Sequence, residues 1–269
     1  AGRRAEALVT SCGLRLSAAR IVGWWRAPRA RVALLLWLLS LPGVVAAAVL
    51  GVPVMLKGQP LPAPMETLML AAGLQSALLL AAAAFGGALL APSVGLHSPL
   101  LEALAGEPRP QRIGARVAAG AVGGVFGAGL LLALAQVAPT ALEAARSAGG
   151  MPLPVRLLYG GISEEVLVRW GLMTGCLWAL WRAAQRGQGA PRTGLVGAAI
   201  VASALLFGAG HLPAAAAWAP NLDATVVAYV VLGNAAFGVV AGYLFWKHGL
   251  ESAMLAHLAA HLLAYAAAG

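Results

Sequence analysis

Two adjacent glutamates, Glu164 and Glu165, and a nearby arginine, Arg169, lie in the middle of an otherwise apolar stretch. The stretch runs from Leu157 to Trp181, and it is long enough to cross a membrane as a helix. By insertion scales, each charged side chain near the bilayer centre costs about 2.5–3.5 kcal/mol. Such charges need partners or a water-filled cavity, and they commonly mark a functional site.

The spacing of the three charges separates the two acids. Glu165 and Arg169 are four residues apart, so they share a helix face and are expected to form an ion pair. Glu164 is rotated by about 100° around a helix of 3.6 residues per turn. One carboxylate is therefore neutralised within its own helix, while Glu164 is free to face other groups.

Three histidines are predicted at membrane depth in other helices. His211 ends the run ALLFGAGHLP, and His257 and His261 lie one turn apart in AMLAHLAAHLL. Because each of these polar groups needs a partner in hydrocarbon, we expect them to share one site with the glutamates. His97 and His248 fall at predicted cytoplasmic ends, and we assign them no role.

A carboxylate beside histidines can hydrolyse a peptide bond. Peptide hydrolysis needs an activated water molecule and a stabilised oxyanion. Glu164 is suited to take a proton from water and return it to the leaving amine. His211 could hold that water or share the proton.

The composition predicts a membrane protein. Of the 269 residues, 61% are hydrophobic and 10% are charged, against about 25% charged residues in a soluble domain. The sequence predicts an all-α, polytopic transmembrane helix bundle of about seven to eight spans. The seven expected spans are 32–52, 66–90, 114–137, 155–181, 194–212, 224–246 and 249–268, and residues 91–111 leave room for a re-entrant or interfacial helix.

The basic residues set the expected orientation. If the N-terminus is cytoplasmic, 14 of the 18 lysines and arginines fall in cytoplasmic segments, as the positive-inside rule requires. The net charge of +9 is then explained by topology and attraction to anionic lipid, so we expect no nucleic-acid partner.

We divide the chain into a basic interfacial segment, residues 1–31, and a transmembrane protease domain, residues 32–269. In the first segment, Trp24 and Trp25 are flanked by arginines, which suits the headgroup region. An interfacial helix and a loosely ordered anchor fit this segment equally well.

Three motifs resemble those of the CPBP family of intramembrane glutamic proteases. EEVLVR, from Glu164 to Arg169, is similar to the family's EExxxR motif, and FGAGH, from Phe207 to His211, is similar to its FxxxH motif. The stretch from Gly238 to His257 resembles the third motif, which ends in a histidine followed four residues later by Asn or Asp. Here that later residue is His261. The resemblance covers about residues 150–265.

The resemblance implies an Rce1-like fold and an endopeptidase without a cofactor or metal. It implies that Glu164 works with His211, and that His257 and the residue at 261 form the oxyanion hole. Glu165 and Arg169 would fix the helix and the field around Glu164. Phe207 and Asn234 are interpreted as packing and helix–helix contact residues.

Two other functions remain open. Glu164, His211, His257 and His261 are acceptable zinc ligands, which would make the protein an intramembrane metalloprotease. Leu258 stands where an HExxH zincin has its glutamate, and this counts against zinc. The same cluster could also serve as a proton relay in a transporter or non-catalytic scaffold.

The family resemblance implies a protein or peptide substrate with a membrane-associated segment. Family members cut prenylated C-terminal tails, bacteriocin leaders or, in the myxosortase-like group, sorting tails of exported proteins. The Ala, Gly, Arg and Pro bias indicates a GC-rich bacterial genome, so we expect the protein in the bacterial inner membrane. Prenylation of C-terminal tails is a eukaryotic signal, so we do not expect a prenylated substrate. Since His211 falls near the outer end of its span, we expect the site to open outwards.

Overall fold

A computed structural model describes residues 28–142, 150–219 and 221–268 of the chain. Within these ranges all regular structure is helical and no strand occurs, so the predicted all-α architecture is confirmed. The predicted segment 1–31, with Trp24 and Trp25, lies almost entirely outside the described residues. The first described helix begins at Pro28, slightly before the predicted start of the first span.

The helices follow one another with short connections. They are α3 (Pro28–Ala46), η1 (Ala47–Gly51), α4 (Val52–Met55), α5 (Met65–Val94), α6 (Pro99–Leu104), α7 (Ile113–Gln136), η2 (Thr140–Leu142), η3 (Val155–Ser163), η4 (Val166–Met173), α9 (Thr174–Gln185), α10 (Thr193–Gly210), α11 (Leu212–Ala216), α12 (Ala224–His248) and α13 (Leu250–Ala268).

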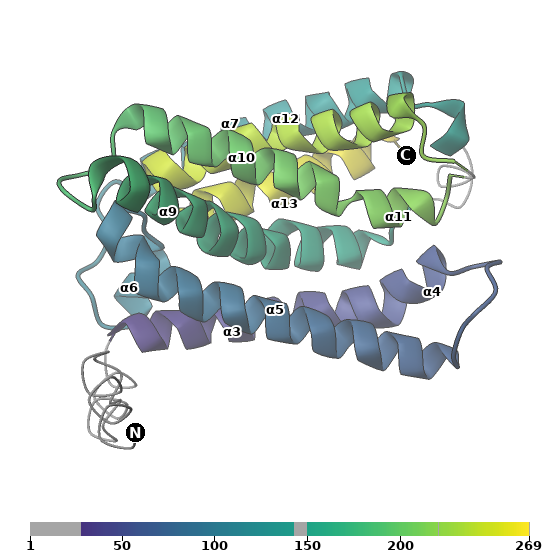
Figure 1. The fold of residues 1–269 in the computed structure, drawn as a ribbon, viewed down its shortest axis with the longest axis horizontal. Coiled ribbons are helices and arrows are strands. Elements are labelled where there is room, and N and C mark those ends of the chain that lie inside the picture. Colours follow the sequence, from purple (N-terminus) through teal and green to yellow (C-terminus); the bar gives the residue numbers. More distant parts are fainter. Residues whose placement is uncertain (1–27, 143–149, 220, 269) are drawn as a thin grey trace, which may run out of the picture.

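Five of the predicted spans are long and apolar enough to cross a membrane. These helical segments are Pro28–Met55, Met65–Val94, Ile113–Gln136, Thr193–Ala216 and Ala224–His248. The other two predicted spans are also helical and lie in the same bundle, as η3, η4 and α9 and as α13 (Figure 1). The chain is therefore an integral membrane protein with a polytopic helical bundle.

The helical segment from η3 to α9 occupies the middle of the bundle. In Figure 1 it lies between the pair α3 and α5 on one side and the group α7, α10, α12 and α13 on the other. Its three parts contact α3, α5, α10, α12 and α13. The two glutamates and Arg169 therefore lie on the helix with the most neighbours, where a buried charge can be matched from several sides.

This central segment is not a regular α-helix. Its stretches η3 and η4 are π-helical, and Glu164 and Glu165 lie at the junction between them. The backbone N–H of Glu164 donates to the carbonyl of Tyr159, five residues earlier. π-Helical turns are rare and often occur at functional sites, and the regular helical spacing used for the sequence does not predict them.

Hydrogen bonds hold the segment around α6 at one end of the bundle. Helix α5 ends at Gly95, whose φ of 71° is left-handed, and α6 is a single short helix. Glu251 at the start of α13 accepts hydrogen bonds from Ser98 Oγ at 2.8 Å and from the backbone N–H of Leu100 at 2.8 Å. The range 91–111, for which the sequence left room for a re-entrant or interfacial helix, therefore holds one short helix, α6.

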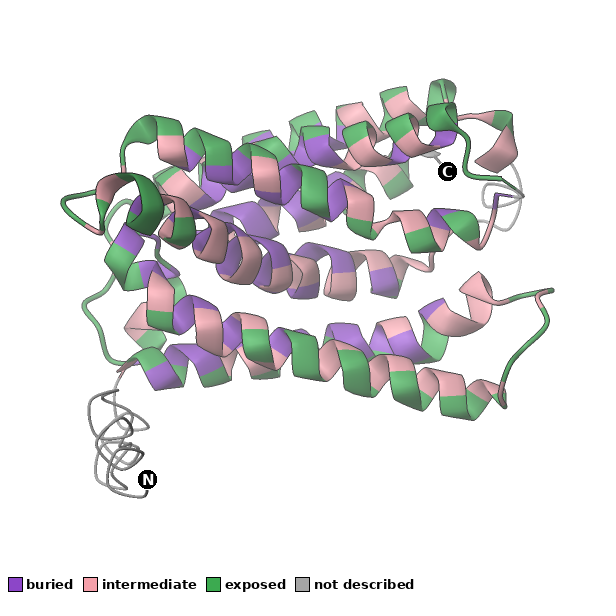
Figure 2. Cartoon of the chain, viewed as in Figure 1, coloured by how far each residue is buried: buried purple, intermediate pink, exposed green. Residues whose placement is uncertain are grey.

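The outer surfaces of the bundle suit lipid. Figure 2 shows exposed residues along the outer side of α5 and buried residues on the central segment. Leu70, Leu74 and Leu78 of α5 lie at a spacing of four residues and are 73%, 59% and 63% exposed. Large apolar side chains with this exposure are stable in hydrocarbon and unfavourable in water.

Two adjacent glycines in α5 provide a test of how the central segment packs. A Cβ at Gly87 would overlap the side chain and the backbone carbonyl of Trp170, whereas a Cβ at Gly86 would meet nothing within 4 Å. Trp170 Nε1 also donates to Ala84 O at 3.0 Å. Since overpacking costs about 1–3 kcal/mol, Gly87→Ala should lower the unfolding temperature in detergent. Gly86→Ala is the control, and equal unfolding temperatures would contradict this packing.

Candidate active site

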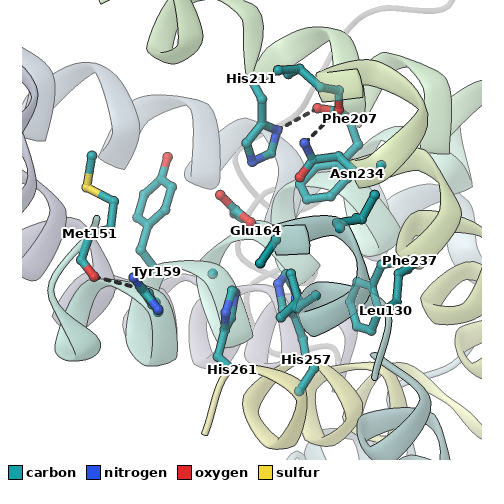
Figure 3. Close-up of a pocket in the computed structure, with 18 of the residues that line it drawn as sticks. Leu130, Met151, Tyr159, Glu164, Phe207, His211, Asn234, Phe237, His257 and His261 are labelled. Carbon is teal, nitrogen blue, oxygen red and sulfur yellow. Dashed lines mark hydrogen bonds between the residues drawn. The ribbon is translucent and has the colours of Figure 1, made fainter. Parts of the chain in front are cut away.

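A cavity of about 500 Å³ opens between the central segment and helices α7, α10, α12 and α13. Its lining includes residues from the ends of α7 and α10 and from the start of α12, and these parts of the helices lie at the end of the bundle opposite α6 in Figure 1. Figure 3 shows the side chains that reach it, with the Glu164 carboxylate between His211 and His257. All four predicted catalytic residues, Glu164, His211, His257 and His261, line this cavity.

The two glutamates point to different surroundings. Glu164 is partly buried and faces the cavity, as the sequence predicts. Glu165 is fully buried, with an exposed fraction of 0%. Its Oε2 lies 3.2 Å from Arg169 Nε, so the predicted ion pair is confirmed.

Glu165 also contacts the site, which the sequence does not predict. His257 Nδ1 lies 2.8 Å from Glu165 Oε1. Because an ionised carboxylate only accepts hydrogen bonds, His257 Nδ1 carries the proton and donates it. In its neutral form the ring would then have a lone pair on Nε2. One buried carboxylate therefore joins the arginine of its own helix to a histidine of α13.

Arg169 is held by charge and by an aromatic face. Its side chain is fully buried, and its Nη1 and Nη2 make no hydrogen bond with any described residue. The guanidinium carbon lies 5.1 Å from the centre of the Phe207 ring. A cation over an aromatic face is attracted by the ring quadrupole, so Phe207 adds to the stabilisation of the Arg169 charge by Glu165.

The FGAGH motif places His211 through its own backbone. His211 Nδ1 donates to the carbonyl of Phe207 at 2.9 Å, one helical turn earlier. A carbonyl only accepts, so Nδ1 carries a proton, and in the neutral form of the ring Nε2 has a lone pair. The Phe207 ring meets His211 edge-on, with centroids 4.7 Å apart and an angle of 85°. Phe207 thus orients two polar side chains as well as packing.

The two histidines of α13 lie against each other. The rings of His257 and His261 are stacked, with centroids 5.0 Å apart and an angle of 27°. Phe237 of α12 packs on His257 with centroids 4.8 Å apart. His261 lies close to Gly160 of the central segment, where a Cβ would be 3.3 Å from its Nε2. The small residue at 160 leaves room for the imidazole.

The structure adds cavity residues to those predicted as catalytic. Asn234 of α12, interpreted from the sequence as a helix–helix contact, lines the cavity, and its Nδ2 donates to Val230 O at 2.7 Å. Tyr159 and Arg156 of η3 also line it, and Arg156 Nε donates to Met151 O at 2.7 Å. A polar residue in an apolar span was the only feature of the sequence that pointed to Asn234. Whether its side chain faces the cavity depends on how α12 is rotated, which the sequence does not give.

The described residues contain no group of three or more His, Cys, Asp or Glu side chains arranged to hold a metal ion. Glu164, His211, His257 and His261, the zinc-ligand set considered as an alternative, share a cavity but do not form such a group. His257 also has Nδ1 directed to Glu165, so its Nε2 alone faces the cavity.

Comparisons with known proteins identify the C-terminal part of the chain. Residues 150–263 match the family model described as type II CAAX prenyl endopeptidase Rce1-like. No curated protein and no solved structure matches the chain. The matched range contains every residue predicted for the site and agrees with the range of the motif resemblance. With these residues the chain carries an Rce1-like domain of the CPBP family.

Proposed function

We propose that this protein is an intramembrane endopeptidase that hydrolyses a peptide bond near the membrane surface with water activated by Glu164. Membership of an Rce1-like family supports peptide hydrolysis at a membrane. The observation on which the mechanism depends is the single cavity that collects Glu164, His211, His257 and His261 in an otherwise largely apolar bundle.

In the proposed mechanism Glu164 is the general base. Its carboxylate lies between His211 and His257 (Figure 3). A water molecule between Glu164 and His211 would donate one hydrogen bond to the carboxylate and one to the lone pair on His211 Nε2. Glu164 takes the first proton as the water attacks the peptide carbonyl, and it returns this proton to the leaving amine.

The tautomer of His257 changes its expected role as an oxyanion donor. With Nδ1–H donated to Glu165, the neutral ring presents a lone pair at Nε2, which repels an oxyanion. His257 donates from Nε2 only as an imidazolium, and the neighbouring Glu165 carboxylate stabilises that cation. We propose that His257 acts as the imidazolium, with Glu165 as its positioning residue.

His261 complements His257 as the second donor. It lies one turn from His257 and its ring is stacked on it. No hydrogen bond from a described residue fixes its tautomer, so it is free to present an N–H to the substrate carbonyl. This would replace the amide N–H that the family places at this position.

The distribution of basic residues and the position of the cavity support the proposed location and substrate. We propose a bacterial inner-membrane protein with a cytoplasmic N-terminus, because the basic residues then follow the positive-inside rule. The cavity then opens towards the outer face, where the tails and leaders of exported proteins pass. The proposed substrate is therefore a membrane-associated or exported protein that is processed near that face.

The central test compares wild type with Glu164→Gln. The substitution preserves shape and removes the base, and general acid–base catalysis typically contributes 10²–10⁴-fold. New protein termini that appear in membranes of cells expressing the wild type should therefore disappear with Glu164→Gln, as read by terminal proteomics. Persistence of these termini would rule out the glutamic mechanism. If a chelator stops these termini from forming in a wild-type membrane preparation, and added zinc restores their formation, the protein is a metalloprotease instead.

Glu165→Gln is the matched control for the neighbouring carboxylate. Breaking a buried ion pair costs about 3–5 kcal/mol because it leaves an uncompensated charge. We expect both the yield of folded protein and the activity per folded molecule to fall, since Arg169 and His257 lose their partner. Normal yield with unchanged activity would contradict the role given to Glu165.

His261→Ala tests the second oxyanion donor. Loss of one such donor typically lowers the rate by about 10²–10³-fold. We expect kcat to fall by about that factor with KM nearly unchanged, and His261→Asn to recover much of it. If alanine at 261 has no effect, the donor has to be sought elsewhere, beginning with Asn234.

The orientation of the bundle is tested by labelling intact cells. Cysteines replacing Leu212 or Pro213, in a background without Cys12 and Cys176, should react with a membrane-impermeant maleimide. A cysteine replacing Arg186, at the opposite end of the bundle, should react only after the cells are permeabilised. The reverse pattern would invert the proposed topology.

A further inference from the structure

A second hollow lies beside the cavity, on the outer surface of the bundle between α7 and α12. It has a volume of about 620 Å³, and its walls come from α7 and α12 alone. We call it the lateral groove. Its α12 wall runs from Ala224 to Ala236, which is about 18 Å at 1.5 Å per residue. Ala228 and Ala236 on this wall are exposed.

Helix α7 packs mainly on α13 and less extensively on α12. Gly123, Gly124 and Gly127 bring α7 so close to α13 that a Cβ at any of them would overlap or crowd an α13 alanine. Gly127 also meets Phe237 of α12. Nearer its C-terminal end, α7 contributes Leu130 and Leu134 to the groove that lies between it and α12.

The groove and the catalytic cavity share part of their lining. Leu130, Leu134, Tyr229 and Gly233 line both hollows. The hydroxyl of Tyr229 donates to Leu134 O at 2.9 Å, which joins α12 to α7 across the gap. A Cβ at Gly233 would lie 3.2 Å from Leu134 Cδ1. The contact between Tyr229 and Leu134 therefore lies between the groove and the cavity that holds Glu164.

We infer that the lateral groove holds the apolar, membrane-spanning segment of the protein substrate. The polar extension of that segment then passes between Tyr229 and Leu134 to Glu164. This inference rests on the proposed function, and it narrows the substrate class to proteins anchored in the membrane beside the cleavage site.

Three properties of the groove favour such an occupant. Its walls are mostly apolar and lie on two helices of transmembrane length. Its small residues, Ala228, Gly233 and Ala236, let another backbone approach closely, as small residues do between membrane helices. Its inner wall is shared with the cavity that holds the proposed base. An acyl chain would fill the groove, but it offers no peptide bond for Glu164.

Binding is tested without cleavage. The photoreactive residue p-benzoylphenylalanine replaces Ala228 or, as the control, Val239, in Glu164→Gln protein in lipid nanodiscs. Val239 is on the same helix, is 41% exposed and lies outside the groove. The probe is a synthetic leucine–alanine helix of about 20 residues with a polar extension of randomised sequence. We expect severalfold more peptide adduct at 228 than at 239. Equal adducts, or lipid adducts alone at 228, would overturn the inference.

Cleavage gives the second measurement. Ala228→Trp fills the groove without touching Glu164 or the histidines, and Val239→Trp is its matched control. Cleavage of the anchored probes by Ala228→Trp should fall at least about tenfold, which corresponds to about 1.4 kcal/mol. Cleavage of the same extensions without the helix should remain, because they enter through the cavity mouth. Unchanged cleavage of the anchored probes would overturn the inference.

The two measurements separate the groove from the function. If wild type and Glu164→Gln give the same products from every probe, the proposed protease function fails. The cross-linking result still decides whether the groove binds a membrane-spanning segment, because it uses protein without the base. If the wild type cleaves the probes but the Glu164→Gln protein cross-links equally at 228 and 239, the proposed function stands and the binding role of the groove is rejected.

Discussion

The buried carboxylate of Glu165 is the interaction on which the rest of the site depends. A charge with no exposed surface, in a helix at membrane depth, is stable only when partners offset the loss of solvation. Arg169 of the same segment supplies the opposite charge, and His257 of α13 supplies a hydrogen bond. Because the second partner lies on another helix, satisfying Glu165 also fixes how α13 lies against the central segment. It further fixes which nitrogen of His257 faces the cavity.

Close packing makes that contact geometrically feasible. A Cβ at Gly161 would overlap Leu258 of α13, and Gly160 leaves room for His261. The central segment reaches these positions in π-helical turns. The same principle of close approach operates on α7, whose glycines hold it to α13. The bundle therefore uses small residues where helices bring polar groups together. Between α7 and α12 it leaves the lateral groove.

The sequence predicted those features that depend on one helix at a time. The Glu165–Arg169 pair follows from a spacing of four residues, and the membrane spans follow from length and hydropathy. The joint site of Glu164, His211, His257 and His261 was predicted because each polar group is costly alone. The Glu165–His257 contact, the cavity position of Asn234 and the ring of Phe207 under Arg169 were not predicted, because they depend on how helices rotate against one another. The π-helical turns were missed because regular periodicity carries no signal for them.

The hydrolysis proposed for this protein requires water and an apolar substrate to reach the Glu164 carboxylate by different routes. The structure offers two hollows for these requirements, and they differ in the polar side chains that they contain. The cavity contains Glu164, Asn234 and the histidines, so water is stable there. The lateral groove is mostly apolar and faces the lipid side of α7 and α12. Tyr229 belongs to both, with an apolar ring and a hydroxyl bound to Leu134 O. In the proposed function, the contact of Tyr229 with Leu134 O would keep lipid out of the cavity, and a substrate chain that replaces this contact would be admitted.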